Sequence, residues 1–261
     1  MLQLAQHGCL LRSMSVYLNN TSMEFTLLVL FGLAIGSFVS AITYRIPRGI
    51  GFVKGRSFCD SCKKNLIWYD NIPLFSFIFN RAKSRCCGKK ISIRYPLIEI
   101  LTVSCFALLY LNFGFGLLYF VYSLLMLLTL IIFIIDFEFQ IIPDEFTWLL
   151  FICSLFFIPY GVTLAPYSYL FSGFFYSLLF LSLHLITAGK GMGLGDVKLA
   201  LPIGILLGFE KGIYWFILSF IMGGLVSFFL LLLNKANLKS KISFGPFMVV
   251  AFWIVMFFKV Y

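Results

Sequence analysis

The feature that most constrains this chain is the recurrence of apolar runs that are long enough to cross a membrane. A transmembrane α-helix needs about 20 mainly apolar residues. Hydrophobic residues make up 61% of the 261-residue sequence, and charged residues make up only 11%. After Tyr95 almost no segment has the polar face that a helix in water requires. The sequence therefore predicts an all-α polytopic membrane protein.

Eight apolar segments follow one another along the chain. They lie at residues 24–44, 97–113, 116–136, 146–163, 166–188, 196–210, 212–234 and 243–260. The segment 196–210 is short and holds Pro202, so a re-entrant segment is an alternative to a full span at that place. We expect about eight transmembrane helices.

The polar stretch between the first two segments, residues 45–95, holds twelve of the twenty Lys and Arg residues. The positive-inside rule places such a loop in the cytoplasm, and eight spans then place both ends of the chain outside. The net charge is +10, but the cations are concentrated beside the membrane. We therefore expect membrane lipid, and no nucleic acid, as a partner.

This reading divides the chain into four parts. They are an extracytoplasmic segment at residues 1–23, a first transmembrane helix at 24–44, a cytoplasmic cysteine-containing loop domain at 45–95, and a seven-helix membrane domain at 96–261.

Two aspartates stand at the ends of apolar segments and at the same predicted membrane face. Asp136 closes the third segment in IIDFEFQIIPD, and Asp196 opens the sixth in GMGLGDVK. Ionisable residues at the edge of a span are costly and mark functional sites. Two carboxyl groups that share a water can perform aspartic proteolysis: the ionised one takes a proton from water and the protonated one donates to the scissile carbonyl.

The glycines before Asp196 fit this use. Gly191, Gly193 and Gly195 would let the backbone unwind at the membrane edge and approach an extended peptide closely. The competing interpretation is that Asp196 only caps a helix, because Asp is a favoured N-cap residue.

Asp144 fits the role of a helix cap better than Asp136 does, because it follows Pro143 and directly precedes an apolar segment. Asp136 ends a helix, where a carboxylate opposes the helix dipole. The dipole argument also suggests, as a hypothesis, that Asp196 is the base and Asp136 the acid.

The polar loop carries a second group of candidate ligands, Cys59, Cys62, Cys86 and Cys87. Thiols in a cytoplasmic loop favour zinc over disulfides. The two-residue spacing of Cys59 and Cys62 lets both sulfurs reach one tetrahedral ion, whereas adjacent Cys86 and Cys87 are awkward for chelation. We predict zinc, with unligated thiols as the alternative.

Taken in order, these motifs resemble the type IV prepilin peptidases, also called prepilin leader peptidase/N-methyltransferases, which are GxGD-type membrane aspartic proteases. The matching stretches are Gly193-Leu194-Gly195-Asp196, Asp136 with Pro143-Asp144, Gly36-Ser37-Phe38, Tyr44-Arg45-Ile46-Pro47, Trp68-Tyr69-Asp70-Asn71-Ile72-Pro73 and Arg94-Tyr95-Pro96-Leu97-Ile98-Glu99. The resemblance runs from about residue 30 to the end of the sequence.

The resemblance implies an aspartic endopeptidase of the bacterial inner membrane, with its active site facing the cytoplasm. It would remove the short basic leader of prepilins and pseudopilins, with Asp136 and Asp196 as catalytic residues. The peptidase reaction would need no cofactor. Many members also methylate the new N-terminal residue with S-adenosylmethionine.

The chain departs from the family pattern in the cysteine loop. The family commonly has a second C-x-x-C pair, and the missing ligand position falls on Ser84, so Cys86 would have to substitute. Two other classes stay open: an ion-coupled transporter that uses the two aspartates as a relay, and a zinc-bearing scaffold. The position of both aspartates at one face, rather than at the midplane, counts against transport, and a scaffold leaves the pair unused.

Overall fold

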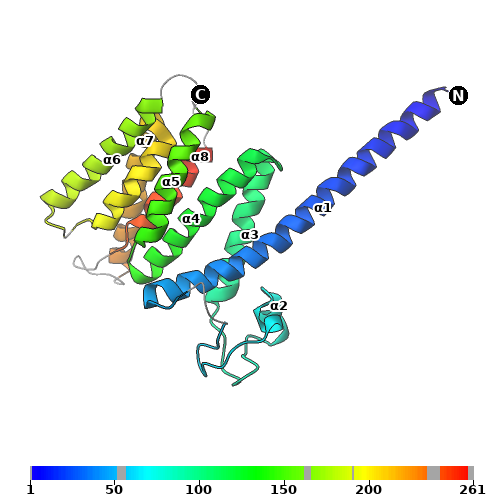
Figure 1. The fold of residues 1–261 in the computed structure, drawn as a ribbon, viewed down its shortest axis with the longest axis horizontal. Coiled ribbons are helices and arrows are strands. Elements are labelled where there is room, and N and C mark those ends of the chain that lie inside the picture. Colours follow the sequence, from blue (N-terminus) through cyan, green and yellow to red (C-terminus); the bar gives the residue numbers. More distant parts are fainter. Residues whose placement is uncertain (1, 52–56, 162–165, 190, 234–241, 258–261) are drawn as a thin grey trace. The chain divides into compact units, whose positions relative to one another are not determined.

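A computed structural model describes residues 2–51, 57–161, 166–189, 191–233 and 242–257, and these residues form helices and turns but no strand. Figure 1 shows the α-helices, which in chain order are α1 (Leu2–Arg45), α2 (Phe75–Phe79), α3 (Arg94–Phe113), α4 (Leu117–Phe139), α5 (Asp144–Gly161), α6 (Pro166–Ile186), α7 (Leu194–Leu232) and α8 (Gly245–Phe257). The predicted all-α class is confirmed.

Five described helical segments are long and apolar enough to cross a membrane. They are α3, α4, α7, Tyr167–Ile186 in α6, and Met23–Arg48, which joins the end of α1 to the short 3-10 helix Ile46–Arg48. Helix α8 is a shorter apolar helix. The first apolar stretch begins at Met23, although α1 itself begins at Leu2. The predicted segment ends at 162–163, 234 and 258–260 lie outside the described residues. The protein is a polytopic membrane protein, and the count of about eight crossings stays a prediction.

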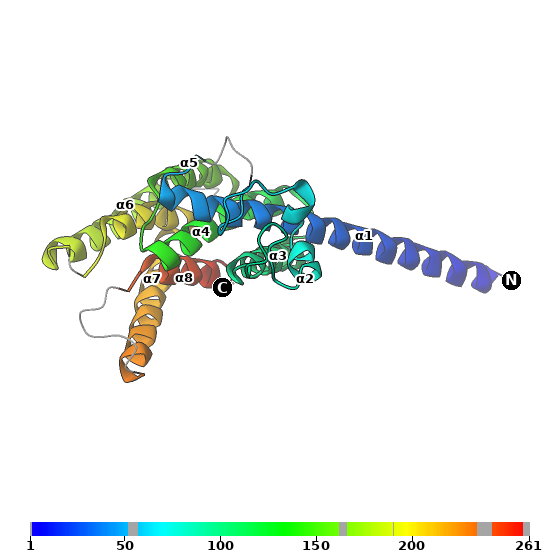
Figure 2. The ribbon, with the colours of Figure 1, turned by 90° about the horizontal axis from the view of Figure 1, so that it is seen from below.

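Helix α7 is broken at Gly208. Its 39 residues would span about 58 Å if straight, nearly twice the thickness of the hydrocarbon core of a bilayer. Gly208 interrupts the helix with φ 73° and ψ −175°, a conformation open essentially to glycine alone. Figure 2 shows the two parts of α7 pointing in different directions. The break separates the two segments predicted at 196–210 and 212–234.

The chain divides into two compact units. The N-terminal unit comprises residues 1–42 and 51–123, and the C-terminal unit comprises residues 43–50 and 124–261. Within the N-terminal unit, α1 packs closely on α3: a Cβ added at Gly36 would lie 2.8 Å from the Cα of Glu99, and one at Gly32 would lie 3.2 Å from Val103. Small residues allow this close approach of membrane helices.

The polar loop of the N-terminal unit is tied to α3 by a buried carboxylate. Glu99 is only 6% exposed, and it accepts a hydrogen bond of 2.8 Å from the backbone N–H of Leu74. Leu74 immediately precedes the short helix α2. Glu99 therefore fixes the start of α2 against the membrane helix that follows the loop.

In the C-terminal unit, α6 and α7 lie side by side. The Ser172 hydroxyl donates to the Gly204 carbonyl at 2.8 Å, and the Tyr176 hydroxyl donates to the Phe209 carbonyl at 2.7 Å. Gly173 faces Gly204, where a Cβ on Gly204 would lie 2.8 Å from the Gly173 Cα. These contacts hold the first part of α7, which carries Asp196.

Helix α8 is fastened to α4 and α7 by two buried indoles. The Trp253 Nε1–H donates to Thr129 Oγ1 on α4 at 2.9 Å. The Trp215 Nε1–H on α7 donates to the Met248 carbonyl on α8 at 2.9 Å. These bonds bring the start of α8 to the two helices that carry the predicted aspartates.

Candidate active site

Asp136 lies in the last turns of α4 and is almost completely buried, with 4% of its surface exposed. Its Oδ2 atom accepts a short hydrogen bond from the hydroxyl of Ser243. The backbone N–H of Gly245 also hydrogen-bonds the same carboxyl group. A buried carboxyl group needs such partners, because water cannot solvate it.

Asp196 lies in the first turn of α7 and is 7% exposed. Its Oδ2 atom accepts a hydrogen bond of 3.1 Å from the backbone N–H of Gly193, the residue that precedes the helix. Asp196 is therefore not the N-cap residue that the sequence interpretation considered: Gly193 takes that position, and the Asp196 side chain bonds its backbone N–H from the third position of the helix. The Asp196 carboxyl group also interacts electrostatically with that of Asp136, so its contacts extend beyond its own helix.

Ile142 links the segments that carry the two aspartates. A Cβ added at Gly195 would lie 3.0 Å from the Cβ of Ile142, and one at Gly245 would lie 3.2 Å from the Cδ1 of Ile142. The connection after α4, the start of α7 and the start of α8 thus pack around one side chain. The structure brings Asp136 and Asp196 together at this junction, and their catalytic role stays a prediction.

The three glycines before Asp196 differ in their surroundings. Gly193 is extended, with φ −79° and ψ 154°. Gly195 needs its small size against Ile142, and a Cβ on Gly191 would lie 2.9 Å from the side chain of Thr187. Close packing is therefore a role that the sequence did not indicate, and the predicted flexibility of these residues stays a prediction.

His184 connects α6 to the glycine segment. Its Nδ1 atom is 2.7 Å from the backbone carbonyl of Met192. A Cβ on Gly189, whose φ is 73°, would lie 3.2 Å from the imidazole ring. The imidazole thus holds the turn that leads to Gly193 and Asp196.

Asp144 and Lys198 form an exposed ion pair between the start of α5 and the first part of α7. The Lys198 Nζ donates to both carboxylate oxygens of Asp144, at 2.7 and 2.9 Å. Asp144 is the first residue of α5, and the Thr147 hydroxyl bonds the Pro143 carbonyl at 3.0 Å. Lys198 points to Asp144 rather than to Asp196, as expected from its place two residues further along the helix.

Ser243 and Gly245 are site residues that the sequence analysis missed. The stretch Ser243-Phe244-Gly245-Pro246 contains one usable signal, because proline is favoured in the first turn of a helix and so indicates the start of α8. Nothing in the sequence relates that start to Asp136, which lies 107 residues before Ser243.

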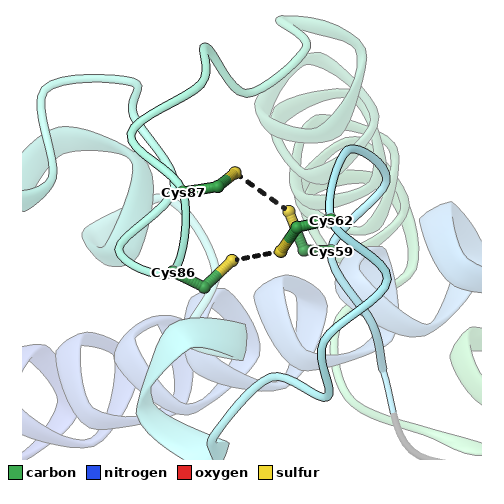
Figure 3. A group of neighbouring side chains, drawn as sticks. All are labelled: Cys59, Cys62, Cys86 and Cys87. Carbon is green, nitrogen blue, oxygen red and sulfur yellow. Dashed lines mark hydrogen bonds between the residues drawn. The ribbon is translucent and has the colours of Figure 1, made fainter.

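The four cysteines of the loop come together in the N-terminal unit (Figure 3). Their sulfur atoms all lie within 4.8 Å of one another. The Sγ atoms of Cys62 and Cys86 are 2.9 Å apart, and those of Cys59 and Cys87 are 3.8 Å apart. Sulfurs around one tetrahedral zinc ion stand about 3.8 Å apart, given Zn–S bonds of about 2.3 Å. The set therefore fits a zinc site.

Two similar turns carry these cysteines. Each is closed by an isolated antiparallel bridge, Phe58 with Asn65 in the first and Lys83 with Lys90 in the second. In the first turn the N–H of Cys59 donates to the carbonyl of Lys64 at 2.9 Å. In the second turn the N–H of Ser84 donates to the carbonyl of Lys89 at 2.8 Å. Ser84 therefore occupies the place that Cys59 has in the first turn.

Cys86 reaches the cluster from a neighbouring place in the second turn, where Cys87 corresponds to Cys62. The hydroxyl of Ser84 lies 3.3 Å from the sulfur of Cys59 and 3.0 Å from that of Cys86. Ser84 thus stands where the second turn would carry a cysteine ligand, as the sequence indicated. Cys86 lies where it can supply the fourth sulfur instead.

The thiols differ in how readily they ionise. Burial opposes ionisation of Cys59, but hydrogen bonds with the Ser84 hydroxyl and with the backbone of Cys62 and Ser61 outweigh it and lower its pKa to about 6. The hydrogen bond with Cys62 raises the pKa of Cys86 to about 12. Metal ligation uses thiolates, so binding at this site has to release the proton of Cys86.

Comparisons with known proteins agree with the two regions described above. Residues 30–113 match the bacterial peptidase A24 N-terminal domain, and residues 123–228 match the type IV leader peptidase family. No solved structure matches the chain.

Three curated relatives carry the name prepilin leader peptidase/N-methyltransferase. The one from Vibrio cholerae is 30% identical over 258 residues, which cover 90% of this chain and 98% of the relative. The one from Klebsiella pneumoniae is 35% identical, over 70% of this chain and 85% of the relative. The one from Bacillus subtilis is 29% identical, over 85% and 89% respectively.

Proposed function

This chain belongs to the type IV leader peptidase family, and on that premise we propose that it is a membrane aspartic endopeptidase that removes the leader of type IV prepilins and pseudopilins. The names of its relatives support this substrate class. The alternative of an ion-coupled transporter has no support in the comparisons.

One observation carries the assignment of catalytic residues: two buried carboxyl groups from distant parts of the chain lie at one junction of helix ends. Asp136 ends α4 and Asp196 begins α7, and their carboxyl groups interact. A lone buried carboxyl group is already costly. Two interacting buried carboxyl groups are the arrangement in which one carboxyl stays protonated while the other ionises.

The proposed reaction is hydrolysis of one peptide bond. The ionised carboxylate takes a proton from water, and the water oxygen attacks the scissile carbonyl carbon while the protonated carboxyl donates to the carbonyl oxygen. The C–N bond then breaks as a proton passes to the leaving nitrogen. The products are a leader with a new carboxylate and a mature chain with a new amine. That Asp196 is the base stays a prediction, and coupled groups titrate as a pair.

The polar loop supports a cytoplasmic location for the site in a bacterial inner membrane. Among the described loop residues, Lys63, Lys64, Arg81, Lys83 and Lys90 are exposed cations. Such a cluster beside membrane helices is retained on the cytoplasmic side and attracts anionic lipid. Membrane lipid is therefore the partner that we propose for this surface.

The names of the relatives also support a second activity, N-methylation of the new N-terminal residue. In that reaction the mature chain's amine attacks the methyl group of S-adenosylmethionine, the carbon–sulfur bond breaks, and the amine loses a proton. S-adenosylhomocysteine leaves. We propose S-adenosylmethionine as the methyl donor for this step.

We further propose that the four-cysteine cluster is a structural zinc site. Cys59, Cys62, Cys86 and Cys87 would hold the ion, which would tie the two turns of the loop together. The cleavage reaction proposed above uses two carboxyl groups and assigns no step to this ion.

Mass analysis of the products tests both activities. The purified full chain would be incubated with a prepilin-type substrate that has a basic leader ending in Gly before an apolar helix. We expect a shortened product without S-adenosylmethionine, and a product heavier by one methyl group with it. An intact substrate under both conditions would contradict the peptidase assignment. A shortened product that is never methylated would contradict only the second activity.

A further inference from the structure

We propose that Ser243 and Gly245, at the start of α8, are positioning residues that hold the carboxyl group of Asp136 in one orientation for cleavage. The inference rests on the proposed peptidase function and adds a third element to its site. It concerns residues that the family motifs quoted above do not contain.

The contact between Ser243 and Asp136 joins two segments that are far apart in the sequence. The Ser243 hydroxyl donates to Asp136 Oδ2 across 107 residues. A serine near the start of a helix usually accepts a hydrogen bond from a backbone N–H of that same helix. The Ser243 hydroxyl instead donates a hydrogen bond to a carboxyl group of α4. Helix capping does not account for this bond.

Position 245 needs a glycine because the Asp136 carboxyl group takes the space of a side chain, and not because of the backbone conformation at this position. Its φ is not positive, so the backbone conformation would accept another residue. A Cβ at this position would, however, overlap Asp136 Oδ2 and lie 3.2 Å from the Asp136 Cγ. The missing side chain leaves the space that Oδ2 occupies, and the Gly245 N–H hydrogen-bonds the carboxyl group there.

Helix α8, which begins beside Ser243 and at Gly245, is itself held in place by hydrogen bonds. Trp253 bonds α8 to Thr129 on α4, and Trp215 on α7 bonds the Met248 carbonyl of α8, each at 2.9 Å. Helix α8 is thereby fixed to both helices that bear an aspartate. A site is well defined when its supporting groups are locked by such contacts.

Each of the two carboxyl groups is anchored through one of its oxygens. Ser243 holds Oδ2 of Asp136, and the Gly193 N–H holds Oδ2 of Asp196 at 3.1 Å. A carboxyl group that is held at one oxygen cannot rotate freely, so its second oxygen also keeps a defined position. Ser243 and Gly245 thus fix the orientation in which the Asp136 carboxyl group exchanges a proton with substrate or water.

The test is the cleavage kinetics of the full chain in membranes, with kcat and KM measured separately. The informative variants are Ser243→Ala, which removes the donor, and Ser243→Thr, which keeps a hydroxyl. Ser219→Ala is the control, because it also removes a serine hydroxyl, but one that is buried and bonds the Trp215 carbonyl of its own helix at 2.6 Å. Asp196→Asn reports on the proposed function itself.

We expect Ser243→Ala to lower kcat by about 10- to 100-fold with little change in KM, as for loss of a hydrogen bond to a charged group. Ser243→Thr and Ser219→Ala should stay within a few-fold of the unchanged protein. Gly245→Ala should lower kcat further, because its Cβ displaces the Asp136 carboxyl.

Three outcomes would overturn the inference. They are a wild-type kcat for Ser243→Ala, an equal fall for Ser219→Ala, or an equal fall for Ser243→Thr. Cleavage by Asp196→Asn would instead remove the peptidase mechanism on which the inference rests. Loss of activity in Asp196→Asn together with a fully active Ser243→Ala would refute the positioning role alone.

Discussion

The cysteine cluster offers a prediction whose size can be worked out. Cys86 reaches the other sulfurs from the place that Ser61 has in the first turn, while Ser84 occupies the ligand place itself. If Cys86 is the fourth ligand, Cys86→Ser leaves a three-sulfur site. Structural zinc sites bind with about 10–16 kcal/mol, so one thiolate of four carries about 3 kcal/mol, or about 100-fold in the dissociation constant.

A second substitution should restore the site. The Ser84 hydroxyl lies 3.3 Å from the Cys59 sulfur and 3.0 Å from the Cys86 sulfur, so a thiol at position 84 would face the same ion. We therefore expect Ser84→Cys to recover most of the zinc affinity that Cys86→Ser loses. The double variant would then carry two C-x-x-C pairs.

The assay is competition for zinc between the purified full chain and a chromophoric chelator. Cys105→Ser is the control, because Cys105 lies in α3 outside the cluster. Unchanged zinc affinity in Cys86→Ser would refute the fourth-ligand role of Cys86. Failure of Ser84→Cys to restore affinity would refute the correspondence between the two turns.

Three further predictions concern separate parts of the molecule. Zinc affinity should rise with pH, because the pKa of Cys86 is raised to about 12 and protons compete with the ion for its sulfur. The same chelator competition, measured over a pH series, checks this. Gly208→Ala should destabilise the protein by about 1–3 kcal/mol, because φ is 73° and the Cβ would lie 2.9 Å from Tyr169, and thermal unfolding in detergent measures it. Asp144→Asn should leave thermal stability almost unchanged, within about 1 kcal/mol, because its pair with Lys198 is exposed.

The sequence predicted those features that depend on local pattern. Apolar runs of membrane length predicted the helical class, and the separate segments at 196–210 and 212–234 anticipated the division of α7 near Gly208. Asp136 and Asp196 could be singled out because an ionisable carboxyl group at the edge of a membrane span is costly and so marks a functional site. Each of these signals lies within a few residues of the feature that it predicts.

The features that were missed depend on contacts between distant segments. Ser243 gives no sign of Asp136, since the bond between them exists only after α8 packs on α4 and α7. Adjacent Cys86 and Cys87 read as a poor chelating pair, because the spacing does not reveal that a turn like that of Cys59 presents both sulfurs. Burial and close approach are products of the fold rather than of local sequence.

The most direct test of the central claim is cleavage of a prepilin-type substrate by membranes that carry equal amounts of the unchanged chain, Asp136→Asn, Asp196→Asn or Asp144→Asn. Each change removes one carboxylate and keeps nearly the same shape. The account predicts that Asp136→Asn and Asp196→Asn lose cleavage while Asp144→Asn, whose carboxylate pairs with Lys198, retains it. Full cleavage by either Asp136→Asn or Asp196→Asn would contradict the account.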